Sequence, residues 1–457
     1  MFAGRKVGTI QAKIQHGRGA DGRKTMISLL MIADDFTGAL DTGVQFAASG
    51  VSTRVVVGSG VELAAKAEQA RVLVVDAETR HLPPEQACAA VERLTRQAVS
   101  LGIPYLYKKT DSALRGNIGA ELTALLRASG EKQLPFLPAY PQMGRITRAG
   151  VHLVEGVPVA ESVFGRDPFE PVRHSSLAEI IGEQSDVPVR LSPALGPRDA
   201  VPDGEGILVF DGTSDRELLE TGRRLLEEGR LHIMAGCAGF GAVLPRLLGL
   251  SSGRPSPMPH LDRRLLVVCG SVNPITVAQL DAAERAGAVR WRMTPEQKLR
   301  PDYWKTGRGQ EDLASLRDGV ARHSPFMIDT NDLGGNGLTR DYARSLGVDL
   351  DGVRLGISRS VGYLVSSLFP DPHVGTLLIT GGDTLLQCME YMGVDEVEPV
   401  CELSAGVVLS RVTYQGCTRC VLTKSGGFGR ETLVGDLVHL LAGQEVKREV
   451  RAAGGLK

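Results

Sequence analysis

The feature that most constrains the fold is an alternation of short apolar runs with amphipathic segments, starting at residue 27. Strands are predicted over 27–33, 53–57, 72–76, 103–106 and 134–137, with helices over about 38–49, 84–100 and 118–129. After an irregular stretch at 139–175, expected to be a long excursion or a β-rich insertion, the alternation resumes at 206–210, 215–228, 231–235 and 240–250. Strands and helices in turn are typical of α/β layers.

A Pro/Ser/Gly-rich stretch divides this series from a second one. Residues 251–259 have no apolar periodicity, which is typical of a linker. Beyond it, strands are predicted over 265–269, 326–329, 376–380, 407–409 and 420–423. We expect two α/β domains with a cleft between them. The predicted divisions are an extension over 1–25, a domain over 26–250, a linker over 251–262, a domain over 263–445 and a tail over 446–457.

Residues 1–25 are expected to be a flexible extension or the product of a wrong start site, with Met26 as the functional start. Their basic residues precede the apolar run 27–33 as in a signal peptide, but the run is short and ends in Asp34-Asp35. The stretch 17–22 matches a dinucleotide-binding pattern by letter, yet no strand precedes it.

Charge and composition argue against several classes of protein. Lys and Arg total 52 against 53 acidic residues, so no bulk attraction to nucleic acid or an anionic membrane is expected. No apolar segment approaches the ~20 residues that span a bilayer. The seven cysteines, without an export signal, predict reduced thiols and a cytoplasmic protein. The single pair Cys417 and Cys420 lacks the second pair that a zinc site needs.

The longest cluster of polar side chains lies between the strand 103–106 and the helix 118–129. It reads Lys-Lys-Thr-Asp-Ser-Ala-Leu-Arg-Gly-Asn over 108–117, at a strand-to-helix turn where open α/β sheets bind ligands. Lys109 and Arg115 can hold an anion. Asp111 can bind a metal or accept a proton, and Ser112 can cap the helix. An ordinary solvated turn would explain the same residues.

Two more strand ends carry similar residues. Asp34 and Asp35 close the first strand, where adjacent carboxylates can bind a cation or a polar substrate and shape the turn. Arg80 follows the strand 72–76 and can clamp a small carboxylate, although alone it would more simply be a surface arginine. Arg145 lies on a Pro/Gly-stiffened loop expected near the same edge. Together Asp34, Arg80 and Lys109 predict an anion pocket.

The second domain carries glycine-rich turns between strands and helices. They are Gly270-Ser271-Val272-Asn273-Pro274, Gly381-Gly382-Asp383-Thr384 and Lys424-Ser425-Gly426-Gly427. Glycines let backbone N–H groups point inward, and a helix N-terminus favours negative charge, so each turn can hold phosphate. One such turn often serves only packing, but three indicate a nucleotide-phosphate site. Without a Walker motif this is no ordinary P-loop enzyme. Beside an anion pocket, the turns predict phosphoryl transfer.

These strings resemble the four-carbon acid sugar kinases, ATP-dependent enzymes that phosphorylate D-threonate, D-erythronate, L-threonate or 3-oxo-tetronate at the 4-hydroxyl. The resemblance spans about residues 27–441 and rests on the strings 32–39 and 109–119, on Gly144-Arg145, and on the three glycine-rich turns in this order. It implies an N-terminal sugar-acid-binding domain and a C-terminal nucleotide-binding domain. Many relatives have Glu where Asp383 stands, which changes length but not charge.

The resemblance also implies site residues. The acid would contact Asp34, Arg80, Lys109, Thr110, Asp111 and Ser112, and ATP would contact Ser271, Gly381, Gly382, Asp383, Thr384 and Gly427. Arg115 is our physical addition, as a second anion clamp. We expect Arg80 and Lys109 to orient a tetronate carboxylate, and Asp34 or Asp111 to accept the hydroxyl proton. Mg²⁺ would bridge the nucleotide phosphates, and domain closure would exclude water.

Three alternatives remain at this point. A nicotinamide-dependent dehydrogenase would need a glycine-rich turn after a strand, and the only match lies before residue 26. A non-catalytic sugar-acid binding protein would not need the phosphate turns. A kinase for another small hydroxy acid is not excluded. The sequence leaves open the acid and its stereochemistry, the aspartate that serves as base, and the choice between a monomer and a homodimer.

Overall fold

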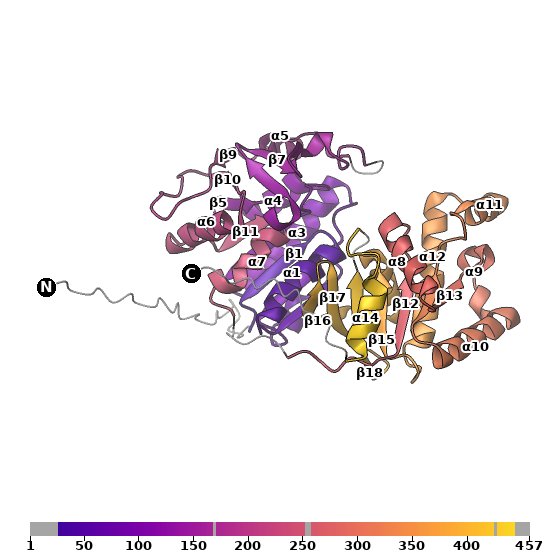
Figure 1. The fold of residues 1–457 in the computed structure, drawn as a ribbon. Coiled ribbons are helices and arrows are strands. Elements are labelled where there is room, and N and C mark those ends of the chain that lie inside the picture. Colours follow the sequence, from indigo (N-terminus) through magenta and orange to yellow (C-terminus); the bar gives the residue numbers. More distant parts are fainter. Residues whose placement is uncertain (1–25, 168–170, 252–256, 425–426, 444–457) are drawn as a thin grey trace. The chain divides into compact units, whose positions relative to one another are not determined.

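The computed structural model describes residues 26–167, 171–251, 257–424 and 427–443, and the chain divides into two compact units between Ser256 and Pro257 (Figure 1). The predicted extension 1–25 and tail 446–457 lie outside the described residues, as do residues 252–256 of the predicted linker. The proposed domain limits stay predictions. No helix in the described ranges is both long enough and apolar enough to cross a membrane.

Unit 1 is built on a parallel sheet. Its strand order is β2-β3-β1-β4-β11-β5-β10-β9, and every one of these neighbouring pairs is parallel. The strands are β1 (Leu29–Ala33), β2 (Thr53–Val57), β3 (Val72–Asp76), β4 (Tyr105–Lys109), β5 (Gln133–Leu137), β9 (Val189–Ser192), β10 (Gly206–Phe210) and β11 (Ile233–Gly236). The helices are α1 (Phe36–Ala48), α2 (Leu63–Lys66), α3 (Pro84–Ser100), α4 (Ile118–Ser129), α5 (Leu177–Gly182), α6 (Asp215–Glu227) and α7 (Ala238–Leu247).

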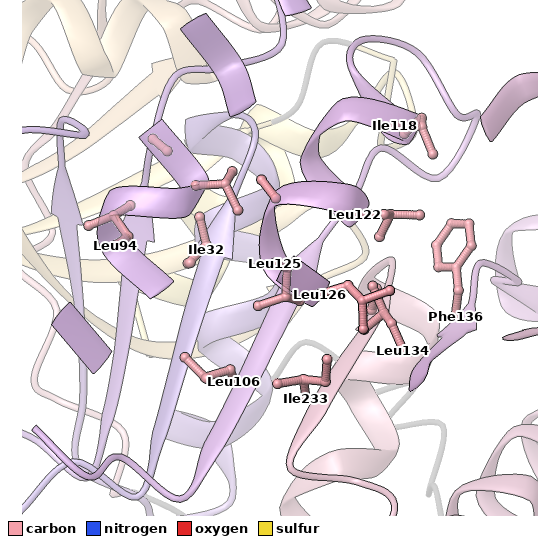
Figure 2. Close-up of a cluster of buried hydrophobic side chains, with 14 of the residues drawn as sticks. Ile32, Leu94, Leu106, Ile118, Leu122, Leu125, Leu126, Leu134, Phe136 and Ile233 are labelled. Atoms are coloured by element: carbon pink, nitrogen blue, oxygen red, sulfur yellow. The ribbon is translucent and has the colours of Figure 1, made fainter. Parts of the chain in front are cut away.

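Alternation along the strands divides their side chains between two apolar layers. On one face, Ile32 and Leu106 join Leu94 of α3 and Leu122 and Leu125 of α4 in a continuous core (Figure 2). Because successive strand residues point to opposite faces, Lys108 lies on the face of Leu106 and Lys109 lies on the other face. This alternation gives the two neighbouring lysines different surroundings.

The irregular stretch after β5 is a β-rich insertion. It contains η1 (Pro141–Met143), an antiparallel sheet of β6 (Arg145–Arg148), β7 (Val151–Val154) and β8 (Val157–Pro158), and η2 (Val159–Glu161). Of the two expectations for residues 139–175, the β-rich insertion is therefore the one observed.

Unit 2 has a mixed sheet of order β13-β14-β12-β15-β18-β17-β16, parallel up to β18 and antiparallel beyond it. The strands are β12 (Leu265–Cys269), β13 (Val289–Arg292), β14 (Phe326–Asp329), β15 (Thr376–Thr380), β16 (Glu396–Ser404), β17 (Val407–Tyr414) and β18 (Cys417–Lys424). The helices are α8 (Pro274–Arg285), α9 (Pro295–Leu299), α10 (Gly307–Arg322), α11 (Gly337–Ser345), α12 (Leu350–Leu368), α13 (Gly382–Met392) and α14 (Leu433–Leu441), with η3 at Tyr303–Lys305.

The two units share a strand arrangement. In unit 1 the first strand, β1, lies between β3 and β4; in unit 2 the first strand, β12, lies between β14 and β15. The chain thus reverses its direction of travel across each sheet at the first strand. In open α/β sheets ligands bind beyond the carboxyl ends of the strands at such a switch point. The polar strand ends of unit 1 and the glycine-rich turns of unit 2 both fall there.

Several predicted element limits were wrong. Strand β4 runs to Lys109 rather than ending at 106, so Lys108 and Lys109 belong to the strand and not to the turn. Ser112 does not cap α4, because the cap position is Asn117 and the first N–H groups of the helix donate to Gln184 Oε1 instead. Strands β17 and β18 are longer than predicted, since their outer halves form an antiparallel hairpin whose polar residues hide the apolar pattern.

Candidate active site

The carboxyl ends of β1, β3 and β4 bring the first group of predicted residues together. Ala33 pairs in register with Asp76 on one side and with Lys109 on the other. The residues that follow these strands therefore emerge at one edge of the sheet. Asp34, Arg80, Lys109 and Asp111 are all buried there.

Arg80 holds the two aspartates that follow β1. Its Nε donates to Asp34 Oδ2 at 2.8 Å and its Nη1 donates to Asp35 Oδ2 at 2.9 Å. Nη2 lies 2.7 Å from oxygens of both carboxylates and 3.7 Å from Asp111 Oδ1. The guanidinium is thus engaged by carboxylates of this same cluster. Asp35 also caps α1 by accepting from the N–H of Gly38.

Lys109 and Arg115 complete the network of charges. Lys109 Nζ lies 3.1 Å from Asp35 Oδ1 and 3.4 Å from Asp34 Oδ1. Arg115 binds Asp111 through Nε at 2.9 Å and Nη2 at 3.1 Å. Asp111 Oδ2 also accepts the backbone N–H groups of Ala113 and Arg115. These bonds fix the turn after β4.

The cations control the ionisation of the buried carboxylates. Burial would raise the pKa of Asp35, but Arg80 and then Lys109 lower it below its ordinary value. The pKa of Asp111 is likewise lowered well below its ordinary value, because Arg80 and Arg115 overcome the effect of burial. Burial and the neighbouring Asp35 raise the pKa of Asp76 well above normal, so this carboxyl is the one favoured in its protonated form.

A second, buried network of one ion pair and several hydrogen bonds links the segment after β3 to β4 and to α4. Lys108 pairs with Glu121 of α4 at 3.1 Å between Nζ and Oε2, and Glu121 also accepts from the hydroxyl of Thr79. Asn117 donates to the carbonyls of Thr79 and Leu82, both at 2.8 Å. These bonds hold the segment that carries Arg80 against the start of α4. Lys108 is therefore a supporting residue rather than a ligand candidate.

Thr110 and Ser112, in the turn after β4, differ in their hydrogen bonding. The hydroxyl of Thr110 is buried and makes no hydrogen bond to any described residue. Ser112 accepts from Arg145 Nη1, and its carbonyl lies 3.0 Å from His152 Nε2. Burial lowers the pKa of His152 to about 4, so this histidine is neutral at ordinary pH. Its one N–H, on Nε2, donates to the carbonyl of Ser112, and its Nδ1 accepts from the hydroxyl of Thr147.

Arg145, His152 and Phe164 also lie at this site, and none of them was among the predicted site residues. They come from the insertion, whose place in the fold the linear pattern does not reveal. The guanidinium carbons of Arg115 and Arg145 lie 5.3 Å and 5.2 Å from the ring centroid of Phe164. The only available signal was Gly144-Arg145, two residues inside a Pro/Gly-rich stretch.

In unit 2 the glycine-rich turns after β12 and β15 lie in contact. A Cβ on Gly270 would come within 2.3 Å of Thr384 Oγ1, so only glycine fits there. Gly381 has a φ of 97°, a conformation suited to glycine, and it precedes α13, whose first turn carries Asp383. The N-terminus of α13 is thus open to an anion.

The third turn lies close to the first. Asn273 caps α8 by accepting from the N–H of Ile275 at 3.0 Å, and its amide lies 3.9 Å from the position of a Cβ built on Gly427. Asn331, after β14, donates to the carbonyl of Ser271 at 3.0 Å. Ser271, Gly381, Gly382, Asp383, Thr384 and Gly427 are therefore gathered at one edge of unit 2, while Ser425 and Gly426 lie outside the described residues.

Lys424 ends β18 beside these turns. Its ammonium donates to Thr276 Oγ1 of α8 at 2.9 Å. Burial lowers the pKa of Lys424 to about 8. Among the described residues, no group of three or more His, Cys, Asp and Glu side chains is arranged to hold a metal ion. A divalent cation here would need oxygens from a bound ligand.

Comparisons with known proteins agree with this division of the chain. Residues 29–244 match a family described as a sugar-binding N-terminal domain, and residues 266–434 match one described as a nucleotide-binding C-terminal domain. A D-threonate kinase from Salmonella typhimurium is 30% identical over 91% of this chain and 98% of its own length. A D-erythronate kinase from Heliobacterium modesticaldum is 26% identical, over 88% and 94%. A 3-oxo-tetronate kinase from Methylobacterium radiotolerans is 27% identical, over 91% and 100%.

Two solved structures share the fold. A Salmonella typhimurium protein described as a tRNA synthase superimposes with a TM-score of 0.73 at 22% identity, covering 90% of this chain and 98% of that one. A Haemophilus influenzae protein gives a TM-score of 0.68 at 20% identity, covering 91% and 99%. At these identities the likeness concerns the fold alone.

Proposed function

The chain belongs to the four-carbon acid sugar kinase family, ATP-dependent enzymes that phosphorylate a sugar acid, and on this premise we propose that it phosphorylates the 4-hydroxyl of a tetronate. The candidates are D-threonate, D-erythronate and 3-oxo-tetronate, the acids named for its relatives. The observation that carries the proposal is the buried cluster of Asp34, Asp35, Arg80, Lys109 and Asp111 at the switch point of unit 1.

The acid would bind at this cluster. Thr110 offers a buried hydroxyl with no hydrogen-bond partner in the described residues, and Ser112 offers a second hydroxyl. Arg80, Lys109 and Arg115 keep the neighbouring carboxylates ionised and aligned. Such a site can accept hydrogen bonds from several hydroxyls and tolerate an anion beside them. A polyhydroxylated carboxylic acid supplies both.

Asp34 and Asp111 are the two candidates for the group that accepts the proton of the attacking hydroxyl. The lowered pKa makes Asp111 a weak base, which suits orientation of the hydroxyl better than early removal of its proton. Phosphoryl transfer through a loose transition state requires mainly positioning and charge neutralisation. A weakly basic but always ionised aspartate is compatible with that requirement.

ATP would lie against Ser271, the turn from Gly381 to Thr384, and Gly427. The N–H groups at the start of α13 would donate hydrogen bonds to phosphate oxygens. Mg²⁺ would enter with the nucleotide, because such ions are commonly held by phosphates with one or two carboxylates, and the exposed Asp383 is the carboxylate at this turn. When bound, Mg²⁺ would neutralise phosphate charge.

The test is an assay of ADP release with ATP and Mg²⁺ across D-threonate, D-erythronate, L-threonate and 3-oxo-tetronate. Turnover on one or more acids, with the phosphate located on the 4-hydroxyl by NMR, would support the proposal. ATP binding without turnover on any of them would redirect the search to other hydroxy acids. No ATP binding by calorimetry would contradict the role given to the glycine-rich turns.

A further inference from the structure

We propose that Arg145, together with Arg115, binds the carboxylate of the substrate and makes the enzyme selective for acids over neutral sugars. This inference rests on the proposed function and gives a role to Arg145, which belongs to the Gly144-Arg145 pair of the resemblance but was not among the site residues that the resemblance implied. It begins from a difference among the cations of the site. Arg80, Lys109 and Arg115 each lie within 3.5 Å of a carboxylate of the cluster.

Arg145 lacks such a partner. No carboxylate of the described residues lies within 4.0 Å of its guanidinium, and its one hydrogen bond within this part of the chain runs from Nη1 to the hydroxyl of Ser112. The side chain is only partly exposed, so water does not fully solvate the charge. A partly buried guanidinium without a counter-ion favours an anionic ligand.

The backbone fixes the position of this side chain. Arg145 begins β6 and pairs with Val154 of β7, and its N–H and C=O both bond to Tyr140 at 3.1 Å and 2.7 Å. Gly144, at a φ of 64°, makes the preceding turn. A clamp built on a paired strand keeps its direction better than one on an open loop.

Arg145 and Arg115 both pack against the ring of Phe164. Both guanidinium carbons lie just over 5 Å from the centroid of this one ring. Two positive charges around a single aromatic ring repel each other, and only Arg115 is compensated within hydrogen-bonding distance, by Asp111. Arg115 Nη1 has Asp167 at 4.0 Å, which is beyond a hydrogen bond. A carboxylate between the two arginines would remove the repulsion and use both planar donors.

The position of Arg145 also suits phosphorylation of the hydroxyl at the other end of the substrate. Ser112, which accepts from Arg145, follows Asp111 directly, so a carboxylate bound at Arg145 lies at one end of the acidic cluster. The hydroxyls of a four-carbon chain can then extend along the aspartates. The carboxylate is held away from the hydroxyl that is phosphorylated.

The test compares Arg145→Gln with the matched control Arg148→Gln, which removes an exposed arginine from the other end of the same strand. We expect Arg145→Gln to raise KM for the acid about 10- to 100-fold, with a smaller change in kcat. Arg145→Lys should recover part of the loss. Arg145→Gln should lower kcat/KM for D-threitol, the neutral analogue, much less than for the acid, so that the preference for acid over alditol collapses. Equal KM values for Arg145→Gln and the control would overturn the proposal.

The outcome is separable from that of the proposed function. Turnover by the unaltered enzyme tests the proposed kinase reaction. The ratio of the KM values of Arg145→Gln and Arg148→Gln for the acid tests whether Arg145 binds the carboxylate. If no tetronate is turned over, calorimetric titration of D-threonate decides the clamp alone. Binding by the unaltered protein and by Arg148→Gln, but not by Arg145→Gln, would support it. Equal binding by all three, or no binding by the unaltered protein, would count against it.

Discussion

Asp111 has the surroundings of an aspartate that acts while permanently ionised. Its Oδ2 accepts two backbone N–H groups and Arg115 Nε, and an asparagine can place its amide oxygen in the same position. The turn should therefore survive the change Asp111→Asn, whereas the charge that orients the hydroxyl is lost. We predict a fall in kcat of about 100-fold or more.

The measurement is steady-state turnover beside thermal unfolding followed by circular dichroism. Asp186→Asn, at an exposed surface pair with Arg127, is the control. A drop in kcat of this size in a variant that is still folded at the assay temperature would fit the prediction. Full activity in Asp111→Asn would remove this residue from the mechanism and leave Asp34 as the candidate base.

Arg80 is a determinant of stability as well as of the site, because it holds Asp34 and Asp35 and neighbours Asp111. Removing one partner of a buried ionic network leaves its charges uncompensated. We predict that Arg80→Met lowers the free energy of unfolding by about 3–5 kcal/mol at neutral pH. An arginine that only contacted substrate would leave stability unchanged.

The loss of unfolding free energy in Arg80→Met should depend on pH in a definite direction. In the native protein the pKa values of Asp35 and Asp111 are lowered, so their stabilising contribution is present above pH 3.8 and is lost only as pH falls below that value. Without Arg80, the cation that lowers both pKa values most is lost, so both pKa values rise. The deficit of Arg80→Met should therefore shrink as pH falls from 7.5 and the carboxylate with fewer remaining cations, Asp35, begins to protonate. Urea unfolding at pH 7.5 and pH 5 measures the deficit, and a constant deficit would contradict this explanation.

At the scale of elements, helix α13 offers a controlled test of the phosphate turns. It begins after Gly381, at φ 97° and ψ 127°, and ends before Gly393, at φ 67° and ψ 30°. Both positions strain an alanine, by about 1–2 kcal/mol at a left-handed position such as Gly393. Only Gly381 lies at the turns proposed to contact ATP. We predict that Gly381→Ala raises KM for ATP at least tenfold, while Gly393→Ala costs stability alone. Equal KM values in the two variants would mean that the turn does not contact the nucleotide.

The strand ends explain why much of the site was predictable and some of it was not. Strong apolar runs and parallel pairing place residues at the ends of β1, β3 and β4 at one edge, so Asp34, Arg80 and Lys109 could be grouped from sequence alone. The different surroundings of Lys108 and Lys109 could not be predicted, because strand β4 continues three residues beyond its apolar run. Arg145 was expected near the same edge, but its contacts could not be predicted, because the short strands of the insertion have no periodicity to locate them.

At the scale of the whole molecule, both units carry their candidate ligand residues at the same place in the strand order. The residues after β1 and β4 in unit 1 correspond to those after β12 and β15 in unit 2. Each unit thus has its own candidate ligand-binding edge, one lined by charged side chains and the other by glycine-rich turns. The acid and the nucleotide are expected to be bound by different units.

This separation predicts that the two binding equilibria respond independently to mutation. Arg145→Gln should weaken binding of D-threonate without changing the affinity for a non-hydrolysable ATP analogue, and Gly381→Ala should do the reverse. In the double variant each binary affinity should equal that of the corresponding single variant within about twofold, because sites without shared partners contribute additively to within about 0.5 kcal/mol. Calorimetric titration of each ligand alone measures these affinities. A tenfold change in nucleotide affinity on replacing Arg145 would mean that this residue also contacts ATP. The carboxylate clamp would then have to be reassigned to the transferred phosphate.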